Sequence, residues 1–416
     1  MITFDYLLPT RLVFGRGRLN ELGGICAEYG KKPLIVTGKS SAKTGLLGRI
    51  TAQLSDCAVF DEVVQNPLST TAEAGLAALR RQGCDMVLAV GGGSPMDTAK
   101  AIAFMAKNEG DINDYIMQRK TGEGALPVVT VSTTAGTGSE ANCFAVLTNP
   151  ATNDKKSLKN PAIFPKVAIL DPELLTSQPP HIVASTGFDA FSHNLEAYIA
   201  NRAQPIVRIL AAQGIRLLFE NLEKAYQNPT DVDAFDQVML ASTLGGMSIC
   251  LAGVGLPHAM EHPVSGLYNV VHGQGLAAIL PKVMRFNAQR APERLAALAV
   301  STGITSTSAD TDKTALAVST GVASTSADTE KTALTVSTGI AGNSASTGEA
   351  ALALCNKIDK LLYSLNLRFT LSQLGVLQKD VAWLAHNAMT LMNANAVNNP
   401  YVPTEEDVYA LFESCL

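Results

Sequence analysis

The stretch CDMVLAVGGGSPMDTAKAIAFMAKN, residues 84–108, most constrains the fold, because it predicts a buried strand, a glycine loop and a helix in direct succession. The same plan returns in LPVVTVSTTAGTGSE, residues 126–140, where a β-rich run ends in a loop of glycine and threonine. Upstream, KPLIVTG (32–38) and CAVFDEV (57–63) are typical of strands, and LSTTAEAGLAALRRQG (68–83) is typical of an amphipathic helix with a glycine C-cap. Strands that alternate with helices predict a doubly wound parallel sheet.

The second half of the chain lacks these β-rich runs. Four long segments fit helical periodicity instead: HIVASTGFDAFSHNLEAYIA, PIVRILAAQGIRLLFENLEKAYQ, AFDQVMLASTLGGMSICLAG and EEDVYALFESC. A chain of 416 residues is also too long for one ordinary core. We therefore expect an α/β dinucleotide-binding domain with a Rossmann-like parallel sheet over residues 1–180 and an all-α metal-binding domain over 181–416, with the boundary at the proline-rich 171–181.

Composition excludes several classes of partner. The net charge is −5 and there is no basic block, which argues against nucleic acid and anionic membranes. No apolar run reaches the roughly 18 residues of a spanning helix, and the N-terminus does not resemble a signal peptide. Seven cysteines are scattered singly without CxxC spacing, so neither a disulfide framework nor a thiolate zinc cluster is expected. These features favour a cytoplasmic protein.

Residues 299–352 consist of three similar 18-residue copies rich in serine and threonine, at 299–316, 317–334 and 335–352. A stacked solenoid is one interpretation, but solenoid units are usually longer and carry a stronger apolar ladder. We interpret the copies as a tandem duplication in a surface connection, where added length costs little loop entropy.

The loop GGGSPMD, residues 91–97, follows a predicted strand and opens a predicted helix. Gly91, Gly92 and Gly93 allow positive φ and close approach of a phosphate, and Ser94 is placed to cap the helix. The free N–H groups at such a helix start favour an anion. The loop matches neither GxGxxG nor the Walker pattern, so a simple tight turn is the alternative.

A second loop, TTAGTGSE (133–140), raises the case for a nucleotide site, because open α/β sheets bind nucleotides where neighbouring strands end. Its hydroxyl groups are possible donors to pyrophosphate or ribose: Thr133, Thr134, Thr137 and Ser139. The alternative is a turn in which these hydroxyls cap the backbone.

Histidines gather in the second half. Asp189 precedes His193 by four residues in GFDAFSHNLEAY, and His258, His262 and His272 crowd into residues 253–275. A surface ion pair at helical spacing would explain the first pair alone. Imidazoles and a carboxylate among apolar residues need partners, and one divalent metal would serve all of them. A carboxylate with imidazoles and no thiolate suits Zn²⁺ or Fe²⁺, which could polarise a substrate oxygen during hydride transfer to nicotinamide.

The remaining histidines have other interpretations. His262 is expected beside the metal or in a proton relay, His386 in a structural role and His181 on the surface.

Five blocks together resemble the iron-containing (group III) alcohol dehydrogenase family, in that family's order and spacing: NPLSTTAEAGLAALRRQGCDMVLAVGGGSPMDTAKAIA, TTAGTGSEAN, AILDPELL, STGFDAFSHNLEAY and HAMEHPVSGLYNVVHGQGLA. The resemblance runs over residues 3–298 and resumes at 349. It implies a dehydroquinate synthase-like fold with the active site in a cleft between an α/β and a helical domain.

The resemblance also implies roles for single residues. The metal ligands fall on Asp189, His193, His258 and His272, with His262 as an additional, non-ligand histidine. The coenzyme positions of the family fall on Gly92, Gly93, Ser94, Asp97 (beside the nicotinamide), Thr133, Thr137, Asn66 and Lys155.

The chain departs from the family at two places. Many NAD-using members carry an aspartate after the strand at 32–38, where this chain has Gly38 followed by Lys39. The missing acid and the nearby lysine favour NADP(H) over NAD(H). The second departure is the repeat region, whose two additional copies we expect to project away from the cleft, so that deleting 299–334 leaves activity intact.

We therefore expect a Fe²⁺- or Zn²⁺-dependent, NAD(P)-linked alcohol dehydrogenase or aldehyde reductase. Apolar residues in GFDAF, CFAV and LAGVG predict a modest apolar pocket for a small primary alcohol or diol. One alternative is a zinc glycerol-type dehydrogenase, which uses three ligands. A dehydroquinate synthase-like lyase would need several basic residues in the cleft, whereas the metal stretch is neutral. A homodimer or larger homo-oligomer is expected from the resemblance.

Overall fold

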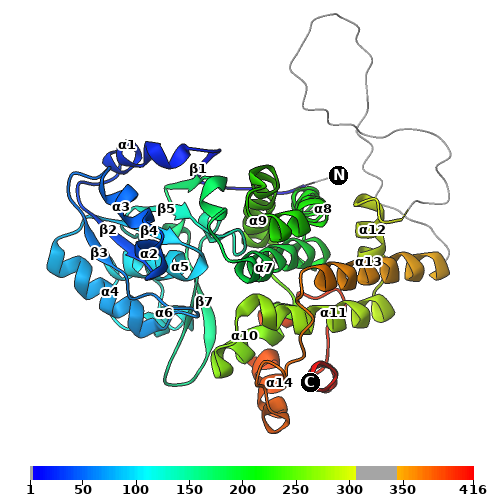
Figure 1. The fold of residues 1–416 in the computed structure, drawn as a ribbon. Coiled ribbons are helices and arrows are strands. Elements are labelled where there is room, and N and C mark those ends of the chain that lie inside the picture. Colours follow the sequence, from blue (N-terminus) through cyan, green and yellow to red (C-terminus); the bar gives the residue numbers. More distant parts are fainter. Residues whose placement is uncertain (1–2, 306–343) are drawn as a thin grey trace, which may run out of the picture.

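A computed structural model describes residues 3–305 and 344–416. Figure 1 shows an α/β part formed by the first half of the chain and a helical part formed by the second. Most of the repeat region lies outside the described residues, so the interpretation of the repeats as a surface insertion is not addressed by the structure.

A six-stranded parallel sheet forms the centre of the α/β part. Its order is β1 (Arg11–Phe14), β8 (Val167–Leu170), β5 (Val128–Ser132), β4 (Met86–Gly91), β2 (Pro33–Thr37) and β3 (Ala58–Phe60). Every neighbouring pair is parallel, which confirms the predicted doubly wound sheet. All residues of β2, β4, β5 and β8 are buried, because helices cover both faces, and this explains why the strands read as continuous apolar runs.

Each face of the sheet packs against its own apolar cluster. One contains Val87 and Ala89 of β4 together with α4 (Ser69–Gln82) and α5 (Gly93–Met105), and the other contains Leu88 with α1 (Leu22–Ala27) and α3 (Leu46–Thr51). The short helices α2 (Ser40–Lys43) and α6 (Ile112–Ile116) complete this part. Helix α4 ends at Gly83, whose φ of 66° is the predicted glycine C-cap.

A β-hairpin that the sequence analysis did not predict leaves the sheet. Strands β6 (Phe144–Thr148) and β7 (Lys155–Lys159) pair antiparallel, with Phe144 opposite Lys159 and Thr148 opposite Lys155. The hairpin contacts α5 and α6 on one side and α10 (Leu256–Tyr268) of the helical part on the other. It therefore links the two parts of the molecule.

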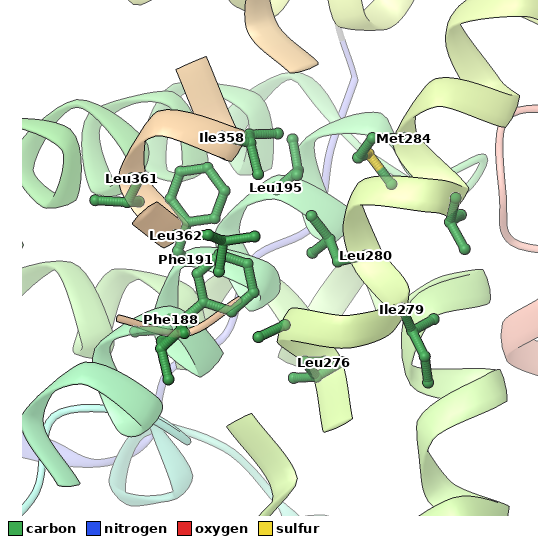
Figure 2. Packing of buried hydrophobic residues seen from close by; sticks show 14 of the residues in the cluster. Phe188, Phe191, Leu195, Leu276, Ile279, Leu280, Met284, Ile358, Leu361 and Leu362 are labelled. Atoms are coloured by element: carbon green, nitrogen blue, oxygen red, sulfur yellow. The ribbon is translucent and has the colours of Figure 1, made fainter. Parts of the chain in front are cut away.

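The helical part contains no strand among its described residues. Its other helices are α7 (Pro180–Ile199), α8 (Pro205–Gln227), α9 (Val232–Ala252), α11 (His272–Arg290), α12 (Glu293–Ser301), α13 (Ser344–Ser364), α14 (Val381–Thr390), α15 (Asn393–Ala396) and α16 (Glu405–Cys415). Figure 2 shows its core, where Phe188 and Phe191 of α7 pack against Leu280 of α11 and Leu362 of α13.

Helix α9 has the length and apolar composition of a membrane-spanning helix, and it alone does so among the described residues. It packs against both α7 and α8, and most of its apolar stretch is buried there. The core of the helical part accounts for its composition.

Candidate metal and coenzyme site

A cleft of about 610 Å³ lies where the hairpin, the start of α5 and the helical part meet. Most residues that the sequence analysis assigned to the site line it: Asn66, Gly93, Ser94, Asp97, Thr137, Lys155, Asp189, His193, His258, His262 and His272. Gly38, Gly92, Thr133 and Thr134 are not among the lining residues. Residues from α5, β7, α7, α10 and α11 thus come together in one cavity.

The four predicted metal ligands converge on one carboxylate oxygen. Asp189 and His193 lie one turn apart on α7, His258 lies on α10, and His272 is the first residue of α11, as predicted. Asp189 Oδ1 lies 3.6 Å from His193 Nε2, 3.7 Å from His258 Nε2 and 3.5 Å from His272 Nε2. Three imidazole nitrogens therefore face the same oxygen at almost equal distances.

These distances fit ligands of a common ion better than hydrogen bonds. An N–H···O hydrogen bond spans about 2.7–3.2 Å. By contrast, tetrahedral ligands about 2.1 Å from an ion lie about 3.4 Å from one another. Asp189 Oδ1 and His258 Nε2 are buried and have no hydrogen-bond partner. One carboxylate oxygen and three imidazole nitrogens are a donor set that suits Fe²⁺ or Zn²⁺.

The Nδ1 atom of each imidazole has its own partner. Glu196 Oε1 lies 2.6 Å from His258 Nδ1, Glu261 Oε2 contacts His272 Nδ1, and the Gly136 carbonyl oxygen lies 3.3 Å from His193 Nδ1. A proton on Nδ1 leaves the Nε2 lone pair free to bind a metal. These partners therefore aim all three Nε2 atoms toward Asp189.

Glu196 and Glu261 were missed in the sequence analysis, although both follow a histidine by three residues on a helix. Both carboxylates are fully buried. Burial opposes ionisation of Asp189 and Glu261, but nearby histidines outweigh it: His193 and His272 at Asp189, and His272 at Glu261. The pKa of each carboxyl is consequently held well below its usual range, so both stay ionised.

His262 stands apart from the convergent set. Its ring centroid is 5.9 Å from that of His258 and 5.7 Å from that of His272, and its buried Nδ1 has no hydrogen-bond partner. It lines the cleft. The structure thus places His262 beside the four predicted metal ligands and within reach of a molecule in the cleft.

The first glycine loop differs from its prediction in two details. Only Gly91 has positive φ, at 147°, and the helix begins at Gly93 with Gly92 as its N-cap. Ser94 lies inside the first turn and forms no capping hydrogen bond, so the prediction that it caps the helix was wrong. The start of α5 still presents free N–H groups where β4 ends.

The second loop packs directly on the first. A Cβ on Gly93 would lie 2.5 Å from Thr137 Cγ2, and a Cβ on Gly92 would lie 2.5 Å from Thr134 Oγ1. Larger residues would push the two loops apart. This close packing, rather than backbone torsion, explains the glycines at these two positions.

A buried polar network fixes the floor of the cleft. Asp97 accepts hydrogen bonds from Ser139 Oγ at 2.7 Å and from the Val146 N–H at 3.0 Å. Lys100, which is fully buried, donates to the carbonyl oxygens of Ser139, Asn142 and Phe144 at 2.5, 3.0 and 2.8 Å. Burial raises the pKa of Asp97 and lowers that of Lys100 to about 8. Lys100 was missed because a lysine in a helix ordinarily reads as exposed.

Lys155 and Asn66 lie at the metal end of the cleft. Lys155 Nζ donates to Asn66 Oδ1 at 2.9 Å and lies 3.5 Å from His272 Nδ1 and 3.8 Å from Glu261 Oε2. Asn66 in turn donates to the Val270 carbonyl oxygen at 3.0 Å. The hairpin is thereby tied to the segment that precedes α11.

The predicted apolar lining is present only in part. Phe144, Val146, Leu251 and Val254 line the cleft, from two of the three quoted segments. The phenylalanines of the third, GFDAF, point into the helical core instead, as Figure 2 shows. Helical geometry explains the error, because residues flanking Asp189 face other sides of α7.

Basic residues line the cleft as well: Lys155, Lys156, Lys159 and Arg202. The neutral metal stretch gave no sign of them, because they come from β7 and from the residues after α7. The cleft is therefore more cationic than the sequence analysis expected.

The two remaining histidines lie outside the cleft lining. His181 is exposed, as predicted. His386 is also exposed, with Nδ1 3.2 Å from Glu405 Oε1, a surface contact that links α14 to α16.

Comparisons with known proteins agree with this arrangement. The model of the iron-containing alcohol dehydrogenases matches residues 9–172, and the model of that family's C-terminal domain matches residues 183–331 and 314–416. The two C-terminal matches overlap over residues 314–331, within the repeat region.

Individual relatives match over most of their length. The chain is 34% identical to a 1,3-propanediol dehydrogenase of Klebsiella pneumoniae over 98% of both chains. It is 37% identical to an NAD-dependent methanol dehydrogenase of Bacillus methanolicus over 71% of this chain and 79% of that one. The crystal structure of an archaeal halo-thermophilic alcohol dehydrogenase from a Red Sea brine pool has 30% identity, full coverage of both chains and a TM-score of 0.85. The fold is thus dehydroquinate synthase-like, and the chain belongs to the iron-containing alcohol dehydrogenases, metal-dependent, nicotinamide-linked enzymes that interconvert alcohols and aldehydes.

Proposed function

We propose that this enzyme interconverts a small primary alcohol or diol and its aldehyde, with Asp189, His193, His258 and His272 as metal ligands. The observation that carries the proposal is the set of three imidazole nitrogens at 3.5–3.7 Å from Asp189 Oδ1, in the cleft that also holds the start of α5. The propanediol and methanol dehydrogenases among the relatives support a small alcohol as substrate.

The metal would supply Lewis-acid polarisation of the substrate oxygen. The chain prepares for this by holding the Nδ1 atoms of its ligand histidines on Glu196, Glu261 and the backbone. His262, which lines the cleft with an unpartnered Nδ1, is placed to pass a proton between the substrate oxygen and the cleft.

The coenzyme would place its pyrophosphate at the start of α5, among Gly92, Gly93 and Ser94. Thr133, Thr134 and Thr137 belong to the facing loop. Asp97 has both carboxylate oxygens engaged by Ser139 and Val146, so we assign it the task of holding the cleft floor beside the nicotinamide.

NADP(H) is our proposed coenzyme. β2 ends at Thr37, and the exposed Lys39 follows Gly38 at that edge of the sheet. A lysine without an acid at Gly38 suits a 2′-phosphate. A KM for NADH at least tenfold below that for NADPH would contradict this choice.

Three further assignments accompany the proposal. Residues 1–180 and 181–416 would be the two domains, since the last sheet strand ends at Leu170 and α7 begins at Pro180. The seven free cysteines fit the reducing cytoplasm. Family resemblance supports a homodimer or larger assembly, which light scattering coupled to gel filtration would measure.

Metal removal provides the main test. The protein would be stripped with a chelator, supplied with Fe²⁺ anaerobically or with Zn²⁺, and assayed for NADPH and NADH oxidation with short aldehydes. We expect one metal to restore turnover in the wild type and neither to do so in Asp189→Asn. Turnover by the metal-free protein, or by Asp189→Asn at the wild-type rate, would refute the ligand assignment.

A further inference from the structure

One face of the hairpin forms a cationic wall of the cleft. Because side chains alternate along a strand, Lys155, Ser157 and Lys159 share one face of β7, and all three line the cleft. Leu158, between them, points the other way into the apolar core of the α/β part. Lys156, the neighbour of Lys155 on the same strand, also lines the cleft, so β7 contributes three lysines to the lining.

Lys155 and Lys159 mark opposite ends of this wall. Lys155 is at the metal end, 3.5 Å from His272 Nδ1. Lys159 lies four residues further along β7, about 13 Å away at the rise of an extended strand. It is exposed, and its Nζ lies 5.3 Å from the centre of the Phe144 ring on the partner strand. Lys159 thus stands at the mouth of the cleft.

Arg202 supplies a second cation to the cleft lining from the helical part. Its Nη2 donates to the Ala394 carbonyl oxygen at 3.1 Å and would lie 2.8 Å from a Cβ on Gly253. These contacts hold the guanidinium between the end of α9 and α15, and its other N–H groups have no hydrogen-bond partner among residues 3–305 and 344–416.

No carboxylate neutralises this part of the cleft among the described residues. Lys156, Lys159 and Arg202 form no ion pair there, in contrast to Lys155, which lies 3.8 Å from Glu261. Within the part of the chain that the structure describes, the carboxylates that line the cleft are Asp97, which accepts hydrogen bonds from Ser139 and Val146, and Asp189. Together with Phe144, Ile249 and Val254, the lining offers an apolar middle and a cationic mouth.

We propose that the preferred substrate is a short aldehyde whose far end carries an anionic group, held by Lys159 and Arg202 as specificity-determining residues. The inference rests on the proposed function and adds that the end of the small substrate remote from the carbonyl carries a negative charge. The carbonyl would lie at the metal end and the anion at the cleft mouth, joined by a short carbon chain along the apolar middle.

The test uses substrates of equal length. Butanal, 4-hydroxybutanal and 4-oxobutanoate differ only in a terminal methyl, hydroxymethyl or carboxylate group. We expect kcat/KM for 4-oxobutanoate to exceed that for the other two at least tenfold. Its KM should rise with ionic strength, because exposed cations are screened by salt, whereas the KM of butanal should not change.

Variants assign the effect to the two cations. Lys159→Met and Arg202→Met should each raise the KM for 4-oxobutanoate about tenfold and leave butanal unchanged, and Lys159→Arg should retain the wild-type value. Lys224→Met, an exposed lysine on α8, is the matched control. Turnover of butanal without preference for 4-oxobutanoate would overturn the inference and leave the proposed function standing. A rise in the KM for NADPH with every aldehyde would also overturn it, because the cations would then serve the coenzyme. No turnover of any aldehyde by the metal-loaded enzyme would refute the proposed function itself.

Discussion

Replacing Lys100 by methionine tests whether its buried network holds the cleft floor. Methionine is unbranched and similar in length, so the change removes the charge and the hydrogen bonds while leaving little cavity. The Nζ atom donates to three carbonyl oxygens and also lies 2.8 Å from Ser139 Oγ and 3.2 Å from Asn142 Oδ1. All of these acceptors would lose a donor.

The magnitude follows from two opposing contributions. Three buried carbonyl oxygens without a donor cost about 1–3 kcal/mol each. Against this, burial lowers the pKa of Lys100 from 10.5 to about 8, and removing the buried ammonium recovers about 3 kcal/mol. At the middle of that range the three carbonyl oxygens cost about 6 kcal/mol, so we expect the free energy of unfolding to fall by about 3 kcal/mol.

Urea unfolding of the metal-loaded protein measures the change through the midpoint, provided that the slope stays constant. Lys107→Met, at an exposed position just beyond α5, should differ from the wild type by less than about 0.5 kcal/mol. If Lys100→Met costs less than about 1 kcal/mol, then water or neighbouring donors satisfy the acceptors and the network does not hold the floor.

The pH dependence of the free energy of unfolding provides a second test of Lys100. Its folded pKa of about 8 lies below its unfolded value of 10.5, so between these values the unfolded chain binds more protons at this position. Stability from this group is therefore lost as pH falls from 10.5 to 8. The stability difference between wild type and Lys100→Met should widen as pH rises through this window, whereas Lys107→Met should follow the wild type.

Three further predictions concern the other parts of the site. Glu196→Gln should weaken metal binding about 10–100-fold in chelator competition, because His258 loses the carboxylate that orients it, while the exposed Glu220→Gln should have no effect. Gly93→Ala should raise the coenzyme Kd at least tenfold with metal content unchanged, since its Cβ would lie 2.5 Å from Thr137 Cγ2; equal binding would contradict the packing argument. Deleting 303–338, two repeat periods in a register that keeps α12 intact, should leave kcat unchanged; a loss of kcat in a folded protein would show that the repeats contribute to turnover.

The elements that could be predicted are those whose pattern is determined by local burial. β2, β4 and β5 are buried on both faces, and their short apolar runs rich in β-branched residues favour a buried parallel strand. Helices α8 and α16 likewise matched their predicted ranges closely, because each carries an apolar stripe between clear end signals. In these segments the local sequence preference and the tertiary packing favour the same secondary structure.

The hairpin could not be predicted in this way. β7 reads KKSLK and has one buried apolar residue, and its pairing with β6 depends on contacts with α5 and α10 that are distant in sequence. The lysines of β7 have the sequence pattern of solvated surface charges, and only the fold brings them against the cleft. Lys100 could not be predicted as buried from the local sequence either. Its five acceptor atoms belong to residues 139–144, about 40 residues further along the chain.

The hairpin is also what makes the metal and coenzyme ends of the cleft one unit. β6 is fixed at the coenzyme end, where the Val146 N–H donates to Asp97 and the Phe144 carbonyl oxygen accepts from Lys100. β7 is fixed at the metal end, where Lys155 donates to Asn66 and approaches Glu261. A displacement of either strand would move both ends, because the strands share one ladder of hydrogen bonds. A substitution that breaks the pairing of β6 with β7 should therefore change coenzyme binding and metal affinity together, whereas substitutions at Glu196 should change metal affinity alone.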